Sequence, residues 1–271
     1  MEYDPIKRSL GNVFNRTAFL RILFYKLLDI LLLRSWHVRK DLKKWAEANS
    51  GSKPVNILDA GSGFGQYTWF MSGLKLNCTI LAVDVKEEQI ADCNAFFGRV
   101  GRKGVLFEKA DLAIFKKSGF FDLILSVDVM EHIADDEKVF ANFHDSLAPE
   151  GMLLISTPSD QGGSDVHDHD HGESFIDEHV RDGYNINGLQ EKLRKAGFSR
   201  TGARYTYGKP GQAAWKLSMK YPVLMLNASK LFFIILPFYY LIIFPFALLF
   251  NYIDLHSTHE SGTGLLVKAW K

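Results

Sequence analysis

A chain of 271 residues is long enough to bury a core of its own, which excludes a small domain held together by disulfides. The 32 basic and 31 acidic side chains leave a formal net charge of +1, which disfavours bulk binding to nucleic acid. Two cysteines, Cys78 and Cys93, are too few for a disulfide framework and fit a reducing compartment. The N-terminus carries Glu2 and Asp4 and lacks the basic-then-apolar order of a secretory signal, so we expect a cytoplasmic catalytic face.

The first apolar segment covers residues 18–33 and is interrupted by Arg21, Lys26 and Asp29. Three ionisable groups argue against a membrane span, which needs about 20 nearly uncharged residues. We therefore predict one or two helices that end near residue 49. Two roles remain open for them: helices packed on the domain, or an amphipathic lid that covers the active site or rests on a bilayer.

Short β-branched runs alternate with helical patterns from residue 55 to residue 156, which is typical of βαβ units in a parallel sheet. A helix at residues 186–196, stopped by Gly197, and two further strand patterns follow. We predict an α/β fold with a doubly wound, seven-stranded, mostly parallel sheet. The expected strands are residues 55–58, 79–83, 105–107, 121–127, 152–156, 198–207 and 264–270. The expected helices between the first five strands are residues 66–74, 87–100 and 135–147.

An apolar strand runs into a glycine-rich turn at residues 56–65, Asn-Ile-Leu-Asp-Ala-Gly-Ser-Gly-Phe-Gly, and the turn opens a helix. Glycines let the backbone approach a ligand closely, and a helix N-terminus offers free N–H groups to it. Asp84 ends the next strand, about 20 residues beyond the turn, where an acid accepts hydrogen bonds from both ribose hydroxyls. Dinucleotide dehydrogenases share this pair of features.

The segment at residues 58–65 resembles the first motif of the class I S-adenosylmethionine-dependent methyltransferases, including its acid. Asp84 and residues 109–112, 121–133 and 147–158 resemble the later motifs of that family, in the same order. Ordered motifs over about a hundred residues are more specific than any one of them, and a dehydrogenase more usually spells its turn G-x-G-x-x-G. The resemblance implies a Rossmann-like fold, S-adenosylmethionine as cofactor and S-adenosylhomocysteine as its product.

The resemblance also assigns the cofactor-binding positions. It places Asp59 near the methionine ammonium group, Asp84 at the ribose and Asp111 opposite the adenine amino group. The full expected set is Asp59, Gly61, Ser62, Gly63, Gly65, Asp84, Val85, Asp111, Leu112, Ser126 and Asp128.

Glu131 and His132 follow the fourth strand, at the edge of an open sheet where ligands bind, so either is a candidate to orient or deprotonate the methyl acceptor. A loop rich in alternating His and Asp lies after the fifth strand and supplies further candidate bases with neighbouring carboxylates. The candidates are His167, His169, His171 and His179. A divalent metal in this loop, or a solvated polar loop, are the alternatives, and the metal is not the favoured one.

Residues 231–250 form an uninterrupted apolar run of about 20 residues, long enough to cross a bilayer. The chain after it resembles the last strand of the methyltransferase sheet, which pairs antiparallel with the sixth, so this insertion must return to the side that it left. Because Pro237 and Pro245 favour broken helices, we expect a shallow hairpin or an in-plane element in one leaflet. Lys216, Lys220 and Lys230 would suit an anionic cytoplasmic surface, and a buried helical subdomain or a dimer interface is the alternative.

We thus expect four parts: an N-terminal lid or membrane-surface helix at residues 1–50, a methyltransferase core at 51–210, an apolar insertion at 211–261 and a final strand at 262–271. The expected function is methylation, at oxygen, of a lipophilic membrane-associated acceptor such as a quinone precursor, a phenol or a lipid headgroup. A membrane-anchored binding protein without the chemistry and a nicotinamide-dependent oxidoreductase are the competing hypotheses. The sequence leaves the oligomeric state open.

Overall fold

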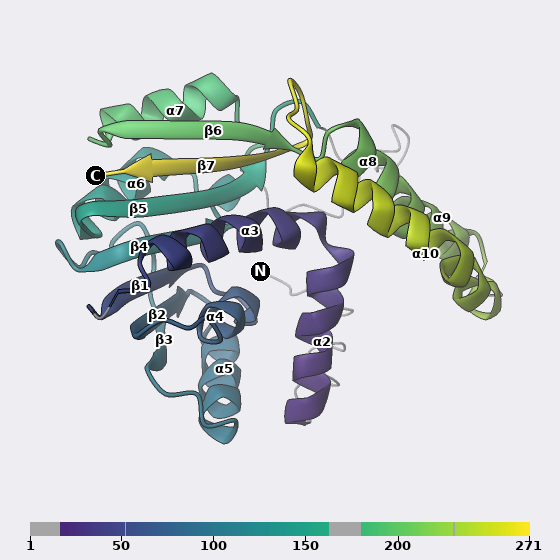
Figure 1. The fold of residues 1–271 in the computed structure, drawn as a ribbon, viewed down its shortest axis with the longest axis horizontal. Coiled ribbons are helices and arrows are strands. Elements are labelled where there is room, and N and C mark those ends of the chain that lie inside the picture. Colours follow the sequence, from purple (N-terminus) through teal and green to yellow (C-terminus); the bar gives the residue numbers. More distant parts are fainter. Residues whose placement is uncertain (1–16, 52, 163–179, 230) are drawn as a thin grey trace.

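A seven-stranded sheet with helices on both faces forms the body of the protein (Figure 1). The computed structural model describes residues 17–51, 53–162, 180–229 and 231–271. The strands are β1 Val55–Ala60, β2 Cys78–Asp84, β3 Val105–Lys109, β4 Phe121–Val127, β5 Leu147–Pro158, β6 Arg200–Thr206 and β7 Gly264–Trp270. Their order is β3-β2-β1-β4-β5-β7-β6, and β7 alone runs antiparallel to its neighbours. The predicted fold class and the antiparallel pairing of the last two strands are confirmed.

The helices of the described residues fall into three groups. α2 Ala18–Leu31 and α3 Leu33–Ala48 precede the sheet. The helices α4 Gln66–Met71, α5 Glu87–Arg99, α6 Asp136–Ser146 and α7 Ile186–Lys195, with the 3-10 turn η1 Met130–His132, connect its strands. The segment between β6 and β7 contains α8 Lys209–Trp215, the π-helical turn η2 Lys216–Lys220, α9 Tyr221–Ala228 and α10 Phe232–His256.

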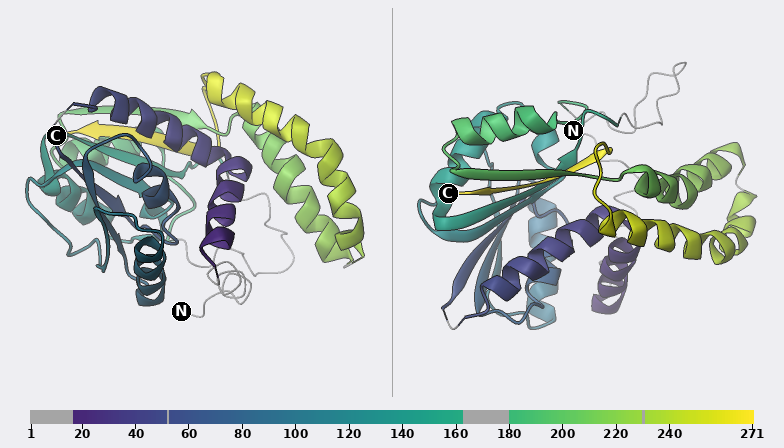
Figure 2. Two further views of the ribbon diagram at one scale, coloured as in Figure 1. Left: turned by 60° about the horizontal axis from the view of Figure 1, so that its bottom comes forward. Right: turned by 45° about the horizontal axis from the view of Figure 1, so that its top comes forward.

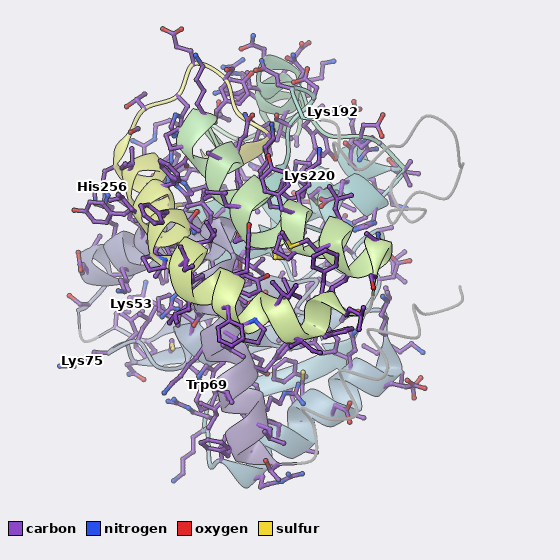
Figure 3. The ribbon with its side chains drawn as sticks, turned by 90° about the vertical axis from the view of Figure 1, so that its right-hand side faces the viewer. Lys53, Trp69, Lys75, Lys192, Lys220 and His256 are labelled. Carbon is purple, nitrogen blue, oxygen red and sulfur yellow. The ribbon has the colours of Figure 1, made fainter. Side chains whose placement is uncertain are left out.

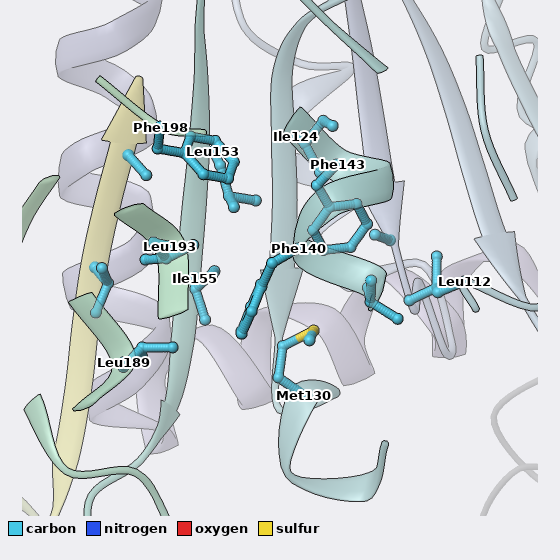
Figure 4. Close-up of a cluster of buried hydrophobic side chains, with 14 of the residues drawn as sticks. Leu112, Ile124, Met130, Phe140, Phe143, Leu153, Ile155, Leu189, Leu193 and Phe198 are labelled. Atoms are coloured by element: carbon cyan, nitrogen blue, oxygen red, sulfur yellow. The ribbon is translucent and has the colours of Figure 1, made fainter. Parts of the chain in front are cut away.

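The central strands β1 and β4 are buried on both faces, which explains their nearly continuous apolar sequences. On one face, Leu58 and Ile124 pack with Phe140 and Phe143 of α6. Figure 4 shows Ile124 beside these two rings. On the other face, the neighbouring residues of the same strands pack against Val38 and Leu42 of α3. This two-sided core holds the carboxyl ends of the parallel strands along one edge.

The insertion between β6 and β7 is a helical hairpin that projects beyond the carboxyl edge of the sheet (Figure 2). The expectation of helices broken at Pro237 and Pro245 is wrong, because both prolines lie inside the continuous helix α10. Each proline removes one backbone hydrogen bond, at a cost of about 3 kcal/mol. Packing on α8 and η2 offsets this cost, helped by Tyr239 and Tyr240, whose hydroxyls donate to the carbonyls of η2 at 2.7 and 2.8 Å.

A buried carboxylate ties the base of the hairpin to the core. Asp254 of α10 has no exposed surface, and its Oδ1 lies 2.9 Å from Nε2 of His37 in α3. Its Oδ2 accepts a hydrogen bond from the Gly211 N–H at 3.0 Å and lies 3.1 Å from Nε2 of His259. A Cβ at Gly211 would come within 2.7 Å of that same Oδ2, so the close approach of α8 to α10 requires glycine here.

We predict that Asp254→Ala loosens the hairpin from α3. The change leaves the partners of a buried carboxylate unsatisfied, so the free energy of unfolding should fall by about 3 kcal/mol in urea titrations. Limited proteolysis should then cut the hairpin faster. Glu260→Ala, at an exposed acid six residues further on, is the control and should match the wild type. Equal stability of Asp254→Ala and the wild type would contradict this role of the carboxylate.

Candidate cofactor and acceptor site

The glycine turn between β1 and α4 has the backbone that the sequence predicts. Gly61, Gly63 and Gly65 have positive φ angles of 80°, 50° and 76°. The N–H groups of Gly61 and Ser62 donate to the carbonyl of Val83 at 2.8 and 2.9 Å, so the turn is fixed to the end of β2. The turn thus curls over the carboxyl edge of the sheet.

Asp84 stands at the end of β2 and faces this turn. Its Oδ2 accepts a hydrogen bond from the Gly63 N–H at 2.9 Å, and its Oδ1 accepts one from the Lys86 N–H at 2.9 Å. A carboxylate offers about four acceptor positions, so Asp84 retains the capacity to accept from further hydroxyl groups. The structure therefore brings together the two features that the sequence analysis paired, the glycine turn and the following acid.

Asp59, the acid of the first motif, is almost completely buried at the end of β1. Its Oδ2 accepts a hydrogen bond from the Thr68 hydroxyl of α4. Burial, with a smaller contribution from the charge of Asp84, raises the pKa of Asp59 to about 6. The carboxylate is therefore mostly ionised at neutral pH, poorly solvated, and suited to a cationic partner.

Two serine hydroxyls of the predicted cofactor set are buried without a hydrogen-bond partner among the described residues. They are Ser62 Oγ in the glycine turn and Ser126 Oγ near the end of β4. Native proteins satisfy nearly all buried polar groups, so these two hydroxyls at one sheet edge are available to hydrogen-bond a polar ligand. Together with the open glycine turn, they fit the polar groups of a nucleoside cofactor.

The remaining predicted cofactor residues follow β2, β3 and β4 at the same edge. Val85 is exposed beside Asp84, and Leu112 is buried in the core. Asp111 is exposed, and its Oδ1 accepts a hydrogen bond from the Ala113 N–H at 2.9 Å. Asp128 has a positive φ of 51° and forms an ion pair with Arg34 of α3. The site residues of β2, β3 and β4 thus lie on neighbouring loops, as the parallel topology requires.

Glu131 and His132 are adjacent in sequence but differ in their surroundings. Glu131 is buried, and its Oε2 accepts a hydrogen bond from the Thr157 hydroxyl of β5 at 3.1 Å. Burial raises the pKa of Glu131, while the charges of His132 and Arg34 act in the opposite direction. His132 is exposed at the end of η1. The pair therefore combines an inward carboxyl group with an imidazole at the surface.

Three residues that the sequence analysis did not select also gather at this edge: Arg34 of α3, Tyr67 of α4 and Tyr207 after β6. The Arg34 N–H donates to the Tyr207 hydroxyl at 3.0 Å, and the Tyr67 hydroxyl lies 3.3 Å from Ser35 Oγ. Tyr207 has a positive φ of 55°, so Arg34 contacts both strained residues of the edge, Asp128 and Tyr207. The only available signal was the position of Tyr207 directly after a strand.

Helix α2 is attached to the glycine turn through one carbonyl. Arg21 Nη2 and the Tyr25 hydroxyl both donate to the Phe64 carbonyl, at 3.0 and 2.5 Å. The Arg21 guanidinium also lies 4.9 Å from the centre of the Phe96 ring of α5. Arg21, one of the charges that interrupt the first apolar segment, thus points into the protein and supports the turn.

Four predicted bases, His167, His169, His171 and His179, lie outside the described residues. Arg181, two residues beyond His179, donates from Nη1 to the Met130 carbonyl at 2.7 Å and lies 3.3 Å from Asp136 Oδ2. It therefore holds the chain after the histidine-rich loop against η1. Within the described ranges, no group of three or more His, Cys, Asp or Glu side chains is arranged to hold a metal ion.

We predict that two glycines of the turn respond differently to substitution. A Cβ at Gly61 would lie 2.2 Å from Val129 Cγ2, whereas a Cβ at Gly63 meets no atom within 4 Å. Gly61→Ala should therefore lower the free energy of unfolding by about 3 kcal/mol, and Gly63→Ala only by about 1 kcal/mol of backbone strain. Chemical denaturation of the two matched variants measures the difference. Equal losses would show that the turn is not packed as described.

The family model described as "Methyltransferase domain" matches residues 58–153. Over 120 residues the chain is 28% identical to the ubiquinone biosynthesis O-methyltransferase of Caulobacter sp. (strain K31), a match that covers 43% of this chain and 47% of that protein. The chain thus spans about half the length of this curated relative.

Solved structures resemble the whole fold. The Haemonchus contortus phosphoethanolamine N-methyltransferase 2, in complex with S-adenosyl-L-methionine, superposes with a TM-score of 0.62 at 16% identity, covering 97% of this chain and 60% of that one. The cyclase SpnF superposes with a TM-score of 0.57 at 16% identity, covering 86% and 80%. At this identity the likeness establishes the fold, and a fold that is shared with a cyclase does not by itself fix the reaction.

Proposed function

We propose, on the premise that the core of this chain belongs to the class I S-adenosylmethionine-dependent methyltransferases, that the protein methylates a hydrophobic acceptor at a membrane surface. The observation that carries this proposal is a set of polar groups at the carboxyl edge of the sheet that are free to bind a ligand. The orphaned hydroxyls of Ser62 and Ser126 lie there with a buried, ionised Asp59 and an open Gly63. These groups supply acceptors, donors and space for a ligand that carries an ammonium group and hydroxyls.

The residues of this edge divide the cofactor among them. Asp84 would accept the ribose hydroxyls, and Asp59 would supply negative charge to the amino-acid end, aided by its low exposure. Gly63 leaves room for a close approach, and Asp111 with Leu112 would border the adenine. The bound cofactor supplies an electrophilic sulfonium methyl group. The protein's task is therefore to orient the acceptor and to remove its proton.

Of the two described candidates, Glu131 and His132, we favour Glu131 as the general base. The pKa of its carboxyl group is raised toward neutral pH, and a base is most effective when its pKa lies near the working pH. The Thr157 hydroxyl fixes the orientation of the carboxyl group. An acceptor hydroxyl or phenol would give up its proton here, which favours methylation at oxygen. His132, and the four histidines of the loop, are further proposed bases on the acceptor side.

The hydrophobic nature of the acceptor is inferred from the surface of α10. One side of this helix, which includes Leu236, Ala247 and Asp254, is buried against the hairpin and the core. The opposite side is almost wholly apolar and exposed, with Leu241 77% exposed and Ile242 64% exposed. The helix is long and apolar enough to span a bilayer, about 37 Å over its 25 residues. Its one-sided packing suits an in-plane position in one leaflet better than a crossing.

Helix α2 supports the same inference, because it buries Arg21 and exposes a stripe of apolar side chains. Arg21 is 3% exposed, whereas Phe19 is 72% exposed, and Leu23, Leu27 and Ile30 continue the apolar stripe. A helix in water would turn its charge outward and its aromatic ring inward. Figure 3 looks onto the side of the molecule where the hairpin projects, with α10 in front and α2 below it. We therefore infer that this side faces an apolar medium.

The hairpin begins beside the candidate site, so a membrane surface at the hairpin would lie next to that site. β6 ends at Thr206 and α8 begins at Lys209, so the hairpin leaves the sheet at the carboxyl edge where the cofactor residues lie. An acceptor dissolved in the bilayer would reach this edge without crossing bulk water. A dimer interface is the alternative use of the same apolar surface.

The proposed activity predicts that the protein binds S-adenosylmethionine and transfers radiolabelled methyl groups to a membrane lipid extract. Asp84→Ala should weaken cofactor binding roughly 100-fold in calorimetry, because two hydrogen bonds to a charged acceptor are lost. Glu108→Ala, at an exposed acid on neighbouring β3, is the matched control.

Two results would oppose the activity. If neither S-adenosylmethionine nor S-adenosylhomocysteine binds, the proposal is wrong, and bound nicotinamide cofactor in the absorbance spectrum would favour an oxidoreductase. Tight cofactor binding without labelled lipid in any extract would favour the non-catalytic binding protein.

The membrane proposal predicts that Leu241→Glu with Ile242→Glu abolishes co-sedimentation with phosphatidylcholine vesicles, because both side chains are exposed on the outer side of α10. Ile114→Glu is the matched control, at a 76% exposed isoleucine after β3, and should bind vesicles like the wild type. Wild-type protein that ignores vesicles but sediments as a dimer, and becomes monomeric in the double variant, would assign the surface to a dimer interface instead.

A further inference from the structure

A surface groove of about 580 Å³ runs along α3 from Trp36 to Glu47, bordered by the end of α2 and the end of α10. Four basic side chains, Arg39, Lys40, Lys43 and Lys44, line it together with two acids, Asp29 and Glu47. Four positive against two negative charges leave an excess of two positive charges. A chain whose overall net charge is +1 thus concentrates cationic groups in this groove.

The two most exposed of these cations are available to a ligand. Arg39 forms an ion pair with Asp29, and Lys40 Nζ donates to the Leu255 carbonyl at 2.7 Å. Lys43 and Lys44 are exposed on α3 and form no ion pair with any of the described residues. Burial, followed by repulsion from Lys44 and Arg204, lowers the pKa of Lys40. An anion between these lysines would relieve that repulsion.

The rest of the groove is apolar and continues into the surface that we assign to the membrane. Ile30 is the last residue of the exposed stripe of α2, and Leu255 lies at the end of α10. Its neighbour His256 is labelled in Figure 3. Trp36 joins them, and its Nε1 donates to the Ile30 carbonyl at 3.2 Å. Tryptophan is enriched where a protein passes from hydrocarbon to lipid headgroups. The groove therefore has the composition of a headgroup site at the rim of an apolar surface.

We propose that this groove binds the phosphate of an anionic phospholipid, with Lys43 and Lys44 as its main partners and the acyl chains directed along Ile30 and Leu255. The inference rests on the proposed membrane association and adds selectivity for the lipid headgroup. Charge complementarity favours binding of an anionic lipid over a zwitterionic one. The apolar part of the groove favours a lipid over free phosphate, because free phosphate would leave the apolar side chains exposed to water.

The test uses the full-length protein, vesicles of phosphatidylcholine alone, and vesicles that contain phosphatidylglycerol as well. Wild-type protein should bind the anionic vesicles on the order of tenfold more tightly, and Lys43→Glu with Lys44→Glu should remove this preference while binding to phosphatidylcholine stays unchanged. Lys75→Glu with Lys103→Glu, at exposed lysines near β2 and β3, makes the same change in net charge and should retain it. Melting curves of both variants check that they fold.

A second readout locates the lipid. Phosphatidylglycerol with brominated acyl chains should quench the emission of Trp36, taken as the difference between the wild type and Trp36→Phe, and the Lys43/Lys44 variant should lose this quenching. Inorganic phosphate at millimolar concentration should not displace the vesicles.

Each outcome decides between the proposals. Equal loss of preference in the two charge-reversal pairs, unquenched Trp36, or displacement by inorganic phosphate would overturn the groove as a lipid site. Wild-type protein that binds both vesicle types equally would do the same and leave the membrane proposal standing. Protein that binds neither vesicle type would overturn both, whereas cofactor binding and methyl transfer are measured separately.

Discussion

The hydrogen bonds between the glycine turn and the end of β2 are the constraint on which the site depends. Gly61 and Ser62 donate to Val83, and Gly63 donates to Asp84, so one short strand end fixes the turn and orients the acid at the same time. These bonds are possible because β1 and β2 are parallel neighbours whose carboxyl ends meet.

The apolar surface and the carboxyl edge of the sheet are parts of one arrangement rather than separate attachments. The same helix, α2, turns Arg21 and Tyr25 onto the Phe64 carbonyl of the turn and exposes Phe19 on its outer side. At the other end, the Asp254 carboxylate fixes α10 to His37 of α3. Movement of α2 against the sheet would therefore strain the contacts that hold the turn.

The local sequence pattern predicted the ranges of the strands well where the burial of a strand and its order along the chain indicate the same assignment. β4 and β7 match the expected ranges in full. β5 begins at Leu147 rather than at residue 152, because a register shift between β4 and β5 lets the turn before residue 152 stay paired with β4. The prolines of α10 misled the prediction, since a tyrosine pair and packing on η2 sustain the helix through them. No motif indicated Arg34, Tyr67 or Tyr207, and only Tyr207 had a weak signal, its position directly after a strand.

The sequence by itself determined the alternating order of strands and helices, the glycine turn and the acids that follow the strands, because periodicity and turn chemistry act over a few neighbouring residues. Only the tertiary structure decided that Glu131 is buried and His132 exposed, that Arg21 points inward, and that Asp254 meets His37 across 217 positions. Burial and long-range pairing depend on how separate elements pack, and no local pattern of residues records that packing.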